Sequence, residues 1–176
     1  MLSPDEPLAG DLPDLIRYSF ESQFYYDVES RQTAGGFTWA LIRRPASPAI
    51  RKEYPWRPFE PHVDSPRGYV ALIDDEPVGY VESAYEDHWR LVRIWHFYVR
   101  QGYRRQGVGR ALMQEVEQAA RHFRARGIIL ETQTCNDPAI LFYQGMGLEF
   151  WGLNTAAYSN SDIDLHEVLV WMGKTV

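Results

Sequence analysis

The spacing of hydrophobic positions changes several times along the second half of the chain, and each change predicts a new element. Dense β-rich runs predict strands at 69–73, 78–85 and 91–99. Apolar residues then recur at helical spacing from Val108 to Phe123, and Gly127 follows a basic last turn, where a glycine suits a helix end. An apolar strand at 128–134 completes a strand–helix–strand order, which predicts a βαβ unit with two parallel strands.

The segments on either side of this unit predict a mixed α/β fold. A second helix opens at Pro138 and ends at Gly147, and strands follow at 148–153 and 167–172. Near the N-terminus, β-rich runs at 24–28 and 37–42 are separated by a Gly-Gly turn signal. We therefore expect a mixed sheet, antiparallel outside the βαβ unit, with helices packed on it.

The chain of 176 residues is predicted to form a single domain, residues 1–176, because its length is typical of one domain and sufficient for a core. Prolines cluster between Pro45 and Pro66. Proline removes an amide donor and biases the preceding residue away from helix. The cluster therefore predicts a Pro-rich surface excursion at about residues 43–68, of the kind that often serves as a lid or loop.

Composition and charge narrow the class of partner. Hydrophobic residues at 45% and charged residues at 24% indicate a globular protein. A net charge of 18 − 24 = −6 disfavours nucleic acid, and no apolar run reaches the roughly 20 residues of a membrane span. The N-terminus lacks the pattern of a signal peptide, and the lone Cys135 suits a reducing compartment. We expect a cytoplasmic protein that binds neither nucleic acid nor membrane.

A glycine-containing loop, Arg104-Arg105-Gln106-Gly107-Val108-Gly109-Arg110, joins the strand that ends at Val99 to the long helix. Glycines let the backbone approach a ligand, and the first amides of a helix favour an anion. Arginines beside them add charge-assisted hydrogen bonds, so the loop predicts a phosphate or pyrophosphate ligand. Two other phosphate-binding motifs do not fit the loop. The dinucleotide-binding pattern needs a third glycine where Leu112 stands, and the P-loop needs Lys and then Ser or Thr after its last glycine, where this chain has Arg110 and Ala111.

At this point the chain resembles the GNAT N-acetyltransferases. The loop is similar to that family's acetyl-CoA pyrophosphate loop, and a second segment follows in family order: Asn136-x-x-Ala139-x-x-Phe142-Tyr143, then Gly147-Leu148. Within the family the chain looks most like the streptothricin acetyltransferases, on the segment Leu130-Glu131-Thr132-Gln133 and a late Tyr158. The resemblance implies a central, mostly antiparallel sheet whose one parallel pair splays apart to hold acetyl-CoA.

The resemblance also implies roles for individual residues. Arg104 and Arg105 would flank the pyrophosphate, which would be held by the amides of Gln106, Gly107, Val108, Gly109 and Arg110. Main-chain groups of Phe97, Tyr98 and Val99 would pair with the pantetheine arm and the thioester, and Asn136 would bond the arm from the far side. Tyr143 would give a proton to the departing thiolate, which suits a phenol that stays protonated at neutral pH.

The base that removes a proton from the amine stays undecided between three alternatives. Streptothricin-type members tend to carry acidic residues where this chain has Trp95-His96. His96 can accept a proton near neutral pH, directly or through water. Glu82 on the preceding strand is the second candidate, and a chain of water molecules is the third.

The remaining candidates carry little chemistry. His62, His88, His122 and His166 form no metal-ligand spacing, so no metal site is predicted. Cys135 is treated as incidental, because a nucleophilic cysteine needs an activating base and the family transfers the acetyl group directly.

The leading interpretation is a transferase that moves an acetyl group from acetyl-CoA to a primary amine of a small molecule, in the manner of streptothricin acetylation. The near alternative acts on a protein N-terminus or lysine, and a different class is a non-catalytic sensor that binds acetyl-CoA. The acceptor and the oligomeric state, a homodimer included, stay open.

Overall fold

The chain is divided between two structural units, and the computed structural model describes residues 1–2 and 7–176. The first unit comprises Met1–Tyr18, Glu53–Leu130 and Gly173–Val176. The second comprises Ser19–Lys52 and Glu131–Met172. In the described part of the chain, no helix is both long and apolar enough to cross a membrane.

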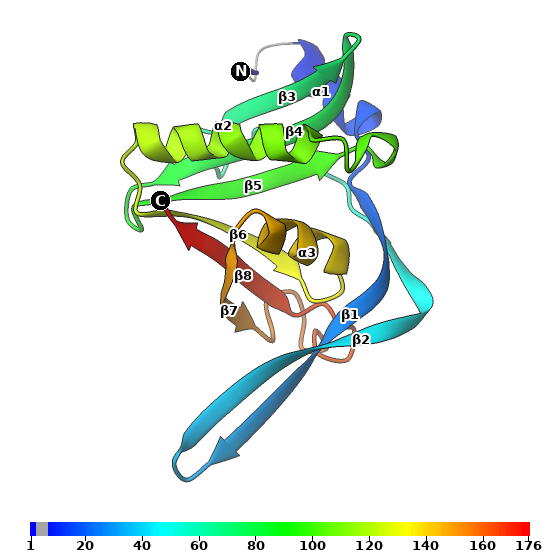
Figure 1. The fold of residues 1–176 in the computed structure, drawn as a ribbon, viewed down its shortest axis with the longest axis vertical. Helices are drawn as coiled ribbons and strands as arrows, with labels where there is room; N and C mark the ends of the chain where they lie inside the picture. Colours follow the sequence, from blue (N-terminus) through cyan, green and yellow to red (C-terminus); the bar gives the residue numbers. More distant parts are fainter. Residues whose placement is uncertain (3–6) are drawn as a thin grey trace. The chain divides into compact units, whose positions relative to one another are not determined.

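The first unit contains the predicted sheet with its parallel pair (Figure 1). Its strands follow the order β3 (Arg67–Ile73), β4 (Glu76–Glu86), β5 (Leu91–Val99) and the start of β6 (Gly127–Gln133). The pairs β3–β4 and β4–β5 are antiparallel. Strand β6 runs parallel to β5 from Leu91/Gly127 to Ile94/Leu130, and β5 continues beyond this ladder. The predicted mixed α/β fold with one parallel pair is confirmed.

Helix α2 (Val108–His122) covers one face of this sheet and contacts β3, β4 and β5 (Figure 1). Gly79 permits the close approach, since a Cβ there would lie 3.0 Å from side-chain atoms of both Val108 and Leu112. The next residue, Tyr80, points to the opposite face, because side chains alternate along a strand. There Tyr80 is buried in a cluster with Leu12 and Ile16.

Two details differ from the predicted elements of this unit. Helix α1 (Pro7–Leu15) was not predicted, because it is short and contains Pro13, a residue that ordinarily ends a helix. Helix α2 ends at His122, and the left-handed residue after it is Arg124 with φ +51°. Gly127 is instead the first residue of β6, so its prediction as the helix-ending glycine was wrong.

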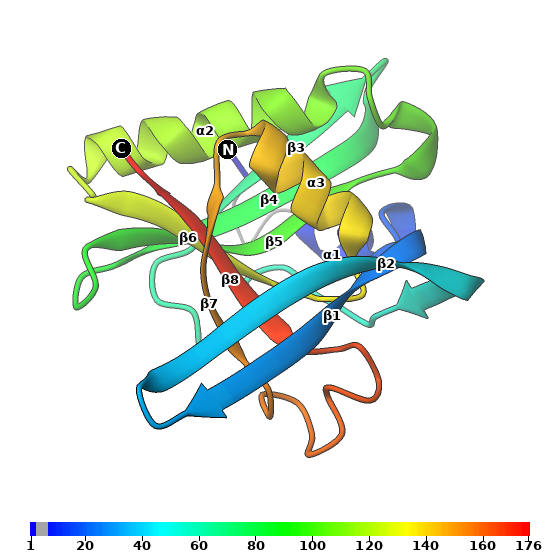
Figure 2. The same ribbon diagram turned by 60° about the horizontal axis from the view of Figure 1, so that its bottom comes forward.

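The second unit combines a long hairpin with the remaining strands (Figure 2). The hairpin pairs β1 (Ser19–Thr33) with β2 (Gly36–Glu53), and the rest of β6 is followed in the sheet by β8 (Leu169–Thr175) and then β7 (Glu149–Asn154). The predicted excursion is shorter than expected, because β2 continues through Pro45 and Pro48. A two-stranded sheet has two outer edges, where a missing proline amide breaks no ladder bond.

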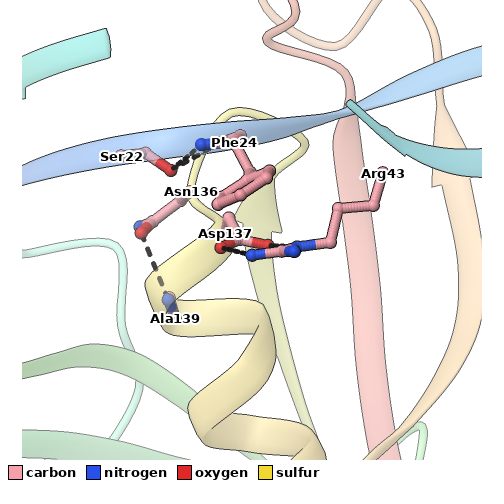
Figure 3. A network of polar contacts seen from close by, with 6 residues as sticks. All are labelled: Ser22, Phe24, Arg43, Asn136, Asp137 and Ala139. Carbon is pink, nitrogen blue, oxygen red and sulfur yellow. Dashed lines mark hydrogen bonds and ion pairs between the residues drawn. The ribbon is translucent and has the colours of Figure 1, made fainter. Parts of the chain in front are cut away.

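Helix α3 (Asp137–Gly145) is fixed to the hairpin by a partly buried ion pair at its first turn (Figure 3). Arg43 of β2 donates from Nε and Nη2 to the two carboxylate oxygens of Asp137, at 2.6 and 3.0 Å. The guanidinium of Arg43 also lies 3.6 Å from the ring centroid of Phe24. Asp137 is 4% exposed, so its charge depends on protein partners, of which Arg43 is the cation.

We predict that Arg43→Met lowers the midpoint of urea unfolding, because it leaves the carboxylate of Asp137 buried without its cation. Arg44→Met is the matched control, since Arg44 meets Asp27 and Glu29 in exposed ion pairs at 3.7 and 3.0 Å. Equal midpoints for the two variants would show that the Arg43–Asp137 pair does not stabilise the second unit.

Candidate active site

The loop between β5 and α2 is held in shape by its own side chains. Arg104 donates from Nε to the carbonyl of Val99 at 2.9 Å, and Gln106 donates from Nε2 to the carbonyl of Gly102 at 2.8 Å. Arg105 and Gly107 both have positive φ, at +62° and +90°. Glycine adopts such a backbone without strain, which suits position 107. These bonds and angles fix where the first amides of α2 lie.

The start of α2 has the properties of an anion site. The amides of Val108, Gly109 and Arg110 precede the first donor of the helical ladder, Ala111, which bonds the carbonyl of Gly107. A Cβ at Gly107 would meet nothing within 4 Å, so the space beside this residue is open. The exposed side chains of Arg105 and Arg110 add positive charge. The residues present fit a pyrophosphate.

Glu82 is the most buried ionisable candidate in the first unit. It lies in the middle of β4, and its side chain has no exposed surface. One oxygen, Oε2, accepts hydrogen bonds from the Tyr80 hydroxyl at 2.6 Å and from the backbone N–H of Phe59 at 2.8 Å. The other oxygen, Oε1, is buried without a partner among the described residues. Glu82 is therefore a fully buried side chain with one bonded and one unbonded carboxylate oxygen.

His96 is the direct partner of Glu82 across the β4–β5 ladder. Its ring lies 5.3 Å from that of Trp56 and 6.4 Å from that of Tyr18, measured between centroids. Burial lowers the pKa of His96, and the negative charges of Glu82 and Glu60 oppose this effect only in part. The imidazole is therefore neutral at pH 7, next to the buried carboxylate.

The β4–β5 ladder has a bulge beside these two residues. Glu82 pairs with His96 and the next residue, Ser83, pairs with Ile94, so Trp95 is the extra residue on β5. Two of the rings that approach this region belong to residues after β2: Trp56, 5.3 Å from His96, and His62, 5.2 Å from Trp95. The part of the predicted excursion that lies after β2, residues 54–66, thus places two aromatic rings near His96 and the neighbouring Trp95.

In the second unit, Asn136 and Tyr143 lie on α3. Asn136 is the N-cap of the helix, and its Oδ1 accepts from the backbone N–H of Ala139 at 3.3 Å (Figure 3). Tyr143 is 7% exposed, with its ring 5.3 Å from that of Phe142. Burial raises the pKa of the Cys135 thiol to about 11, which keeps it protonated and makes it a poor nucleophile.

The structure thus groups the candidate residues by unit. Glu82, His96, the main chain of 97–99 and the loop at 104–110 belong to the first unit, and Asn136 and Tyr143 belong to the second. The sequence did not predict that the backbone N–H of Phe59 would bond Glu82, or that Arg43 would pair with Asp137. Neither leaves a local pattern, because the partners are 23 and 94 residues apart. Among residues 1–2 and 7–176, no group of three or more His, Cys, Asp or Glu could hold a metal ion.

Comparison with known proteins gives a consistent result. The sequence model of the Acetyltransferase (GNAT) family matches residues 36–148. A streptothricin acetyltransferase from Streptomyces lavendulae is 30% identical over 151 residues, which cover 81% of this chain and 78% of that protein. The crystal structure of nourseothricin acetyltransferase has a TM-score of 0.78 at 31% identity, covering 97% of this chain and 95% of that one.

A Bacillus anthracis protein, solved in complex with acetyl coenzyme A, shares the fold with a TM-score of 0.72 at 21% identity, covering 95% of this chain and 92% of that one. The family match spans more than half of the present chain, and the resemblance to the Streptomyces and nourseothricin enzymes extends over most of it. The chain therefore belongs to the GNAT family and is an N-acetyltransferase.

Proposed function

We propose that this enzyme transfers the acetyl group of acetyl-CoA to a primary amine of a small molecule of the streptothricin class. The similarity to enzymes named for streptothricin and nourseothricin supports the substrate class. The observation that carries the proposal is Glu82, a fully buried carboxylate with one oxygen unpartnered among the described residues. Such a group suits an ammonium, which must lose a proton before its nitrogen can attack.

The donor would be held mainly by backbone. Acetyl-CoA supplies a thioester, whose acetyl carbon is the electrophile. The amides at the start of α2, with Arg105 and Arg110, would bind its pyrophosphate, while Arg104 holds the loop through Val99. Main-chain groups of Phe97, Tyr98 and Val99, on the part of β5 beyond the parallel ladder, would pair with the pantetheine arm, and the side-chain amide of Asn136 would bond the same arm.

The acceptor chemistry follows from Glu82 and Tyr143. Glu82 takes one proton from the ammonium through Oε1, and the freed nitrogen forms a bond with the acetyl carbon. The carbon–sulfur bond then breaks, and Tyr143 gives its phenolic proton to the departing sulfur. The nitrogen then loses one of its two protons to solvent and keeps the other as the amide N–H. Glu82 releases its proton to solvent, and the tyrosinate takes one up from solvent. The neutral His96 leaves Oε1 free for this exchange.

Tyr143→Phe is predicted to keep the fold and the affinity for acetyl-CoA and to lose about 10²-fold in turnover, because it deletes only the proton donor. The measurement is release of free thiol from acetyl-CoA with streptothricin as the acceptor. Tyr85→Phe, whose ring stacks on Phe123 with centroids 4.9 Å apart, is the matched control. If Tyr143→Phe turns over at the wild-type rate, Tyr143 is not the general acid.

The same assay separates the competing functions. Acetylation of peptides, with none of streptothricin, would favour a protein substrate. Binding of acetyl-CoA without thiol release with any amine would indicate a sensor.

Glu82→Gln is predicted to lower turnover by about 10²- to 10⁴-fold, whereas Glu86→Gln near the end of the same strand should have little effect. In the wild type, activity should fall only at pH values below 6.5, because burial holds the pKa of His96 under this ordinary value for histidine and protonated His96 then attracts the carboxylate of Glu82. Glu60 and His62 also act on His96, one raising and the other lowering its pKa.

A pH–rate profile of His96→Asn tests this assignment. The acidic limb should move to lower pH while turnover at pH 8 is retained. If His96 is itself the base, this variant will instead lose turnover at every pH, as Glu82→Gln does.

A further inference from the structure

Two buried side-chain polar atoms in the described part of the chain lack a hydrogen-bond partner, and they are complementary. One is the acceptor Glu82 Oε1 and the other is the donor Trp95 Nε1. The two residues lie on neighbouring strands at the same bulge, since Glu82 pairs with His96, the residue that follows Trp95. The candidate site thus contains one unpartnered donor and one unpartnered acceptor, on two paired strands.

Trp95 and His96 both lie near the segment that follows β2: the Trp95 ring is 5.2 Å from that of His62, and the His96 ring is 5.3 Å from that of Trp56. His62 also acts electrostatically on His96. The guanidinium of Arg93 lies 4.9 Å from the Trp95 ring centroid. At the bulge, two successive residues of β5, Trp95 and His96, stand where a regular ladder would have one. The indole thus lies close to His62 and Arg93, and its N–H has no acceptor among the described residues.

An unpaired buried donor is costly, and an apolar residue in its place would avoid that cost. We propose that the acceptor substrate supplies both missing partners, an inference that rests on the function proposed above. Its ammonium donates to Glu82 Oε1, and a carbonyl or hydroxyl oxygen a few bonds away accepts from Trp95 Nε1. The substrate class is then an amine with a hydrogen-bond acceptor close to the reacting nitrogen, such as an aminoacyl amide. Trp95 is a specificity-determining residue for it.

Two nearly isosteric amines test this inference. β-Alaninamide carries a carbonyl near its amine, and isopentylamine replaces the amide group by a branched hydrocarbon. The dissociation constants of both are measured by NMR titration in the presence of coenzyme A, so that the measurement does not depend on turnover. The wild type should bind β-alaninamide about 10- to 100-fold more tightly, because isopentylamine leaves the indole N–H unpaired.

Trp95→Phe should lose this preference, by weakening β-alaninamide while leaving isopentylamine within about threefold. Because the smaller ring can disturb packing, a second variant carries 3-benzothienylalanine at position 95, which replaces only the N–H by sulfur. It should lose the preference equally. Trp89→Phe, in an exposed turn, is the matched control.

No preference in the wild type, or a preference that survives in the benzothienyl variant, would overturn the inference. An equal loss of affinity for both amines would assign Trp95 a structural role and overturn it as well. Failure of the proposed function has a different signature, since the preference would then persist while acetyl-CoA releases no thiol with either amine.

Discussion

The buried carboxylate of Glu82 is the constraint on which the arrangement of the first unit depends. A charge without solvent contact is unfavourable unless hydrogen bonds or counter-charges compensate it. Tyr80 compensates it from the same strand, and the backbone of Phe59 does so from the segment after β2. This segment must therefore fold onto the sheet for the carboxylate to be stable. The same segment carries Trp56, whose ring lies 5.3 Å from that of His96.

The second unit also contains a buried carboxylate, that of Asp137, whose charge another segment compensates. Asp137 suits the positive N-terminal end of α3, but its burial requires a cation, and Arg43 supplies one from the hairpin. The pair fixes the helix that carries Tyr143, while Asn136 closes its first turn. In each unit, then, a segment distant in sequence binds a buried acid: the backbone of Phe59 bonds Glu82, and Arg43 pairs with Asp137. Glu82 is itself a proposed catalytic residue, and Asp137 begins the helix that carries Tyr143.

The sequence predicted those features that rest on local periodicity or on a motif. Strand β5, helix α2 and the loop around Gly107 follow from spacing alone, and the family match confirms the resemblance. The extent of β2 was not predicted, because prolines at an open hairpin edge look like a loop. Glu82 and His96 were candidates, but no local pattern indicates that Phe59 would bind one oxygen and leave the other. The bulge at Trp95 depends on strand register, which spacing does not specify.

The central claim is that Glu82 receives the reacting amine in the first unit. A crystal structure of the enzyme with coenzyme A and streptothricin tests it most directly. The account predicts the reacting nitrogen within hydrogen-bond distance of Glu82 Oε1 and the pyrophosphate on the amides of Val108, Gly109 and Arg110. An amine bound elsewhere, with Glu82 Oε1 still enclosed by protein, would contradict it.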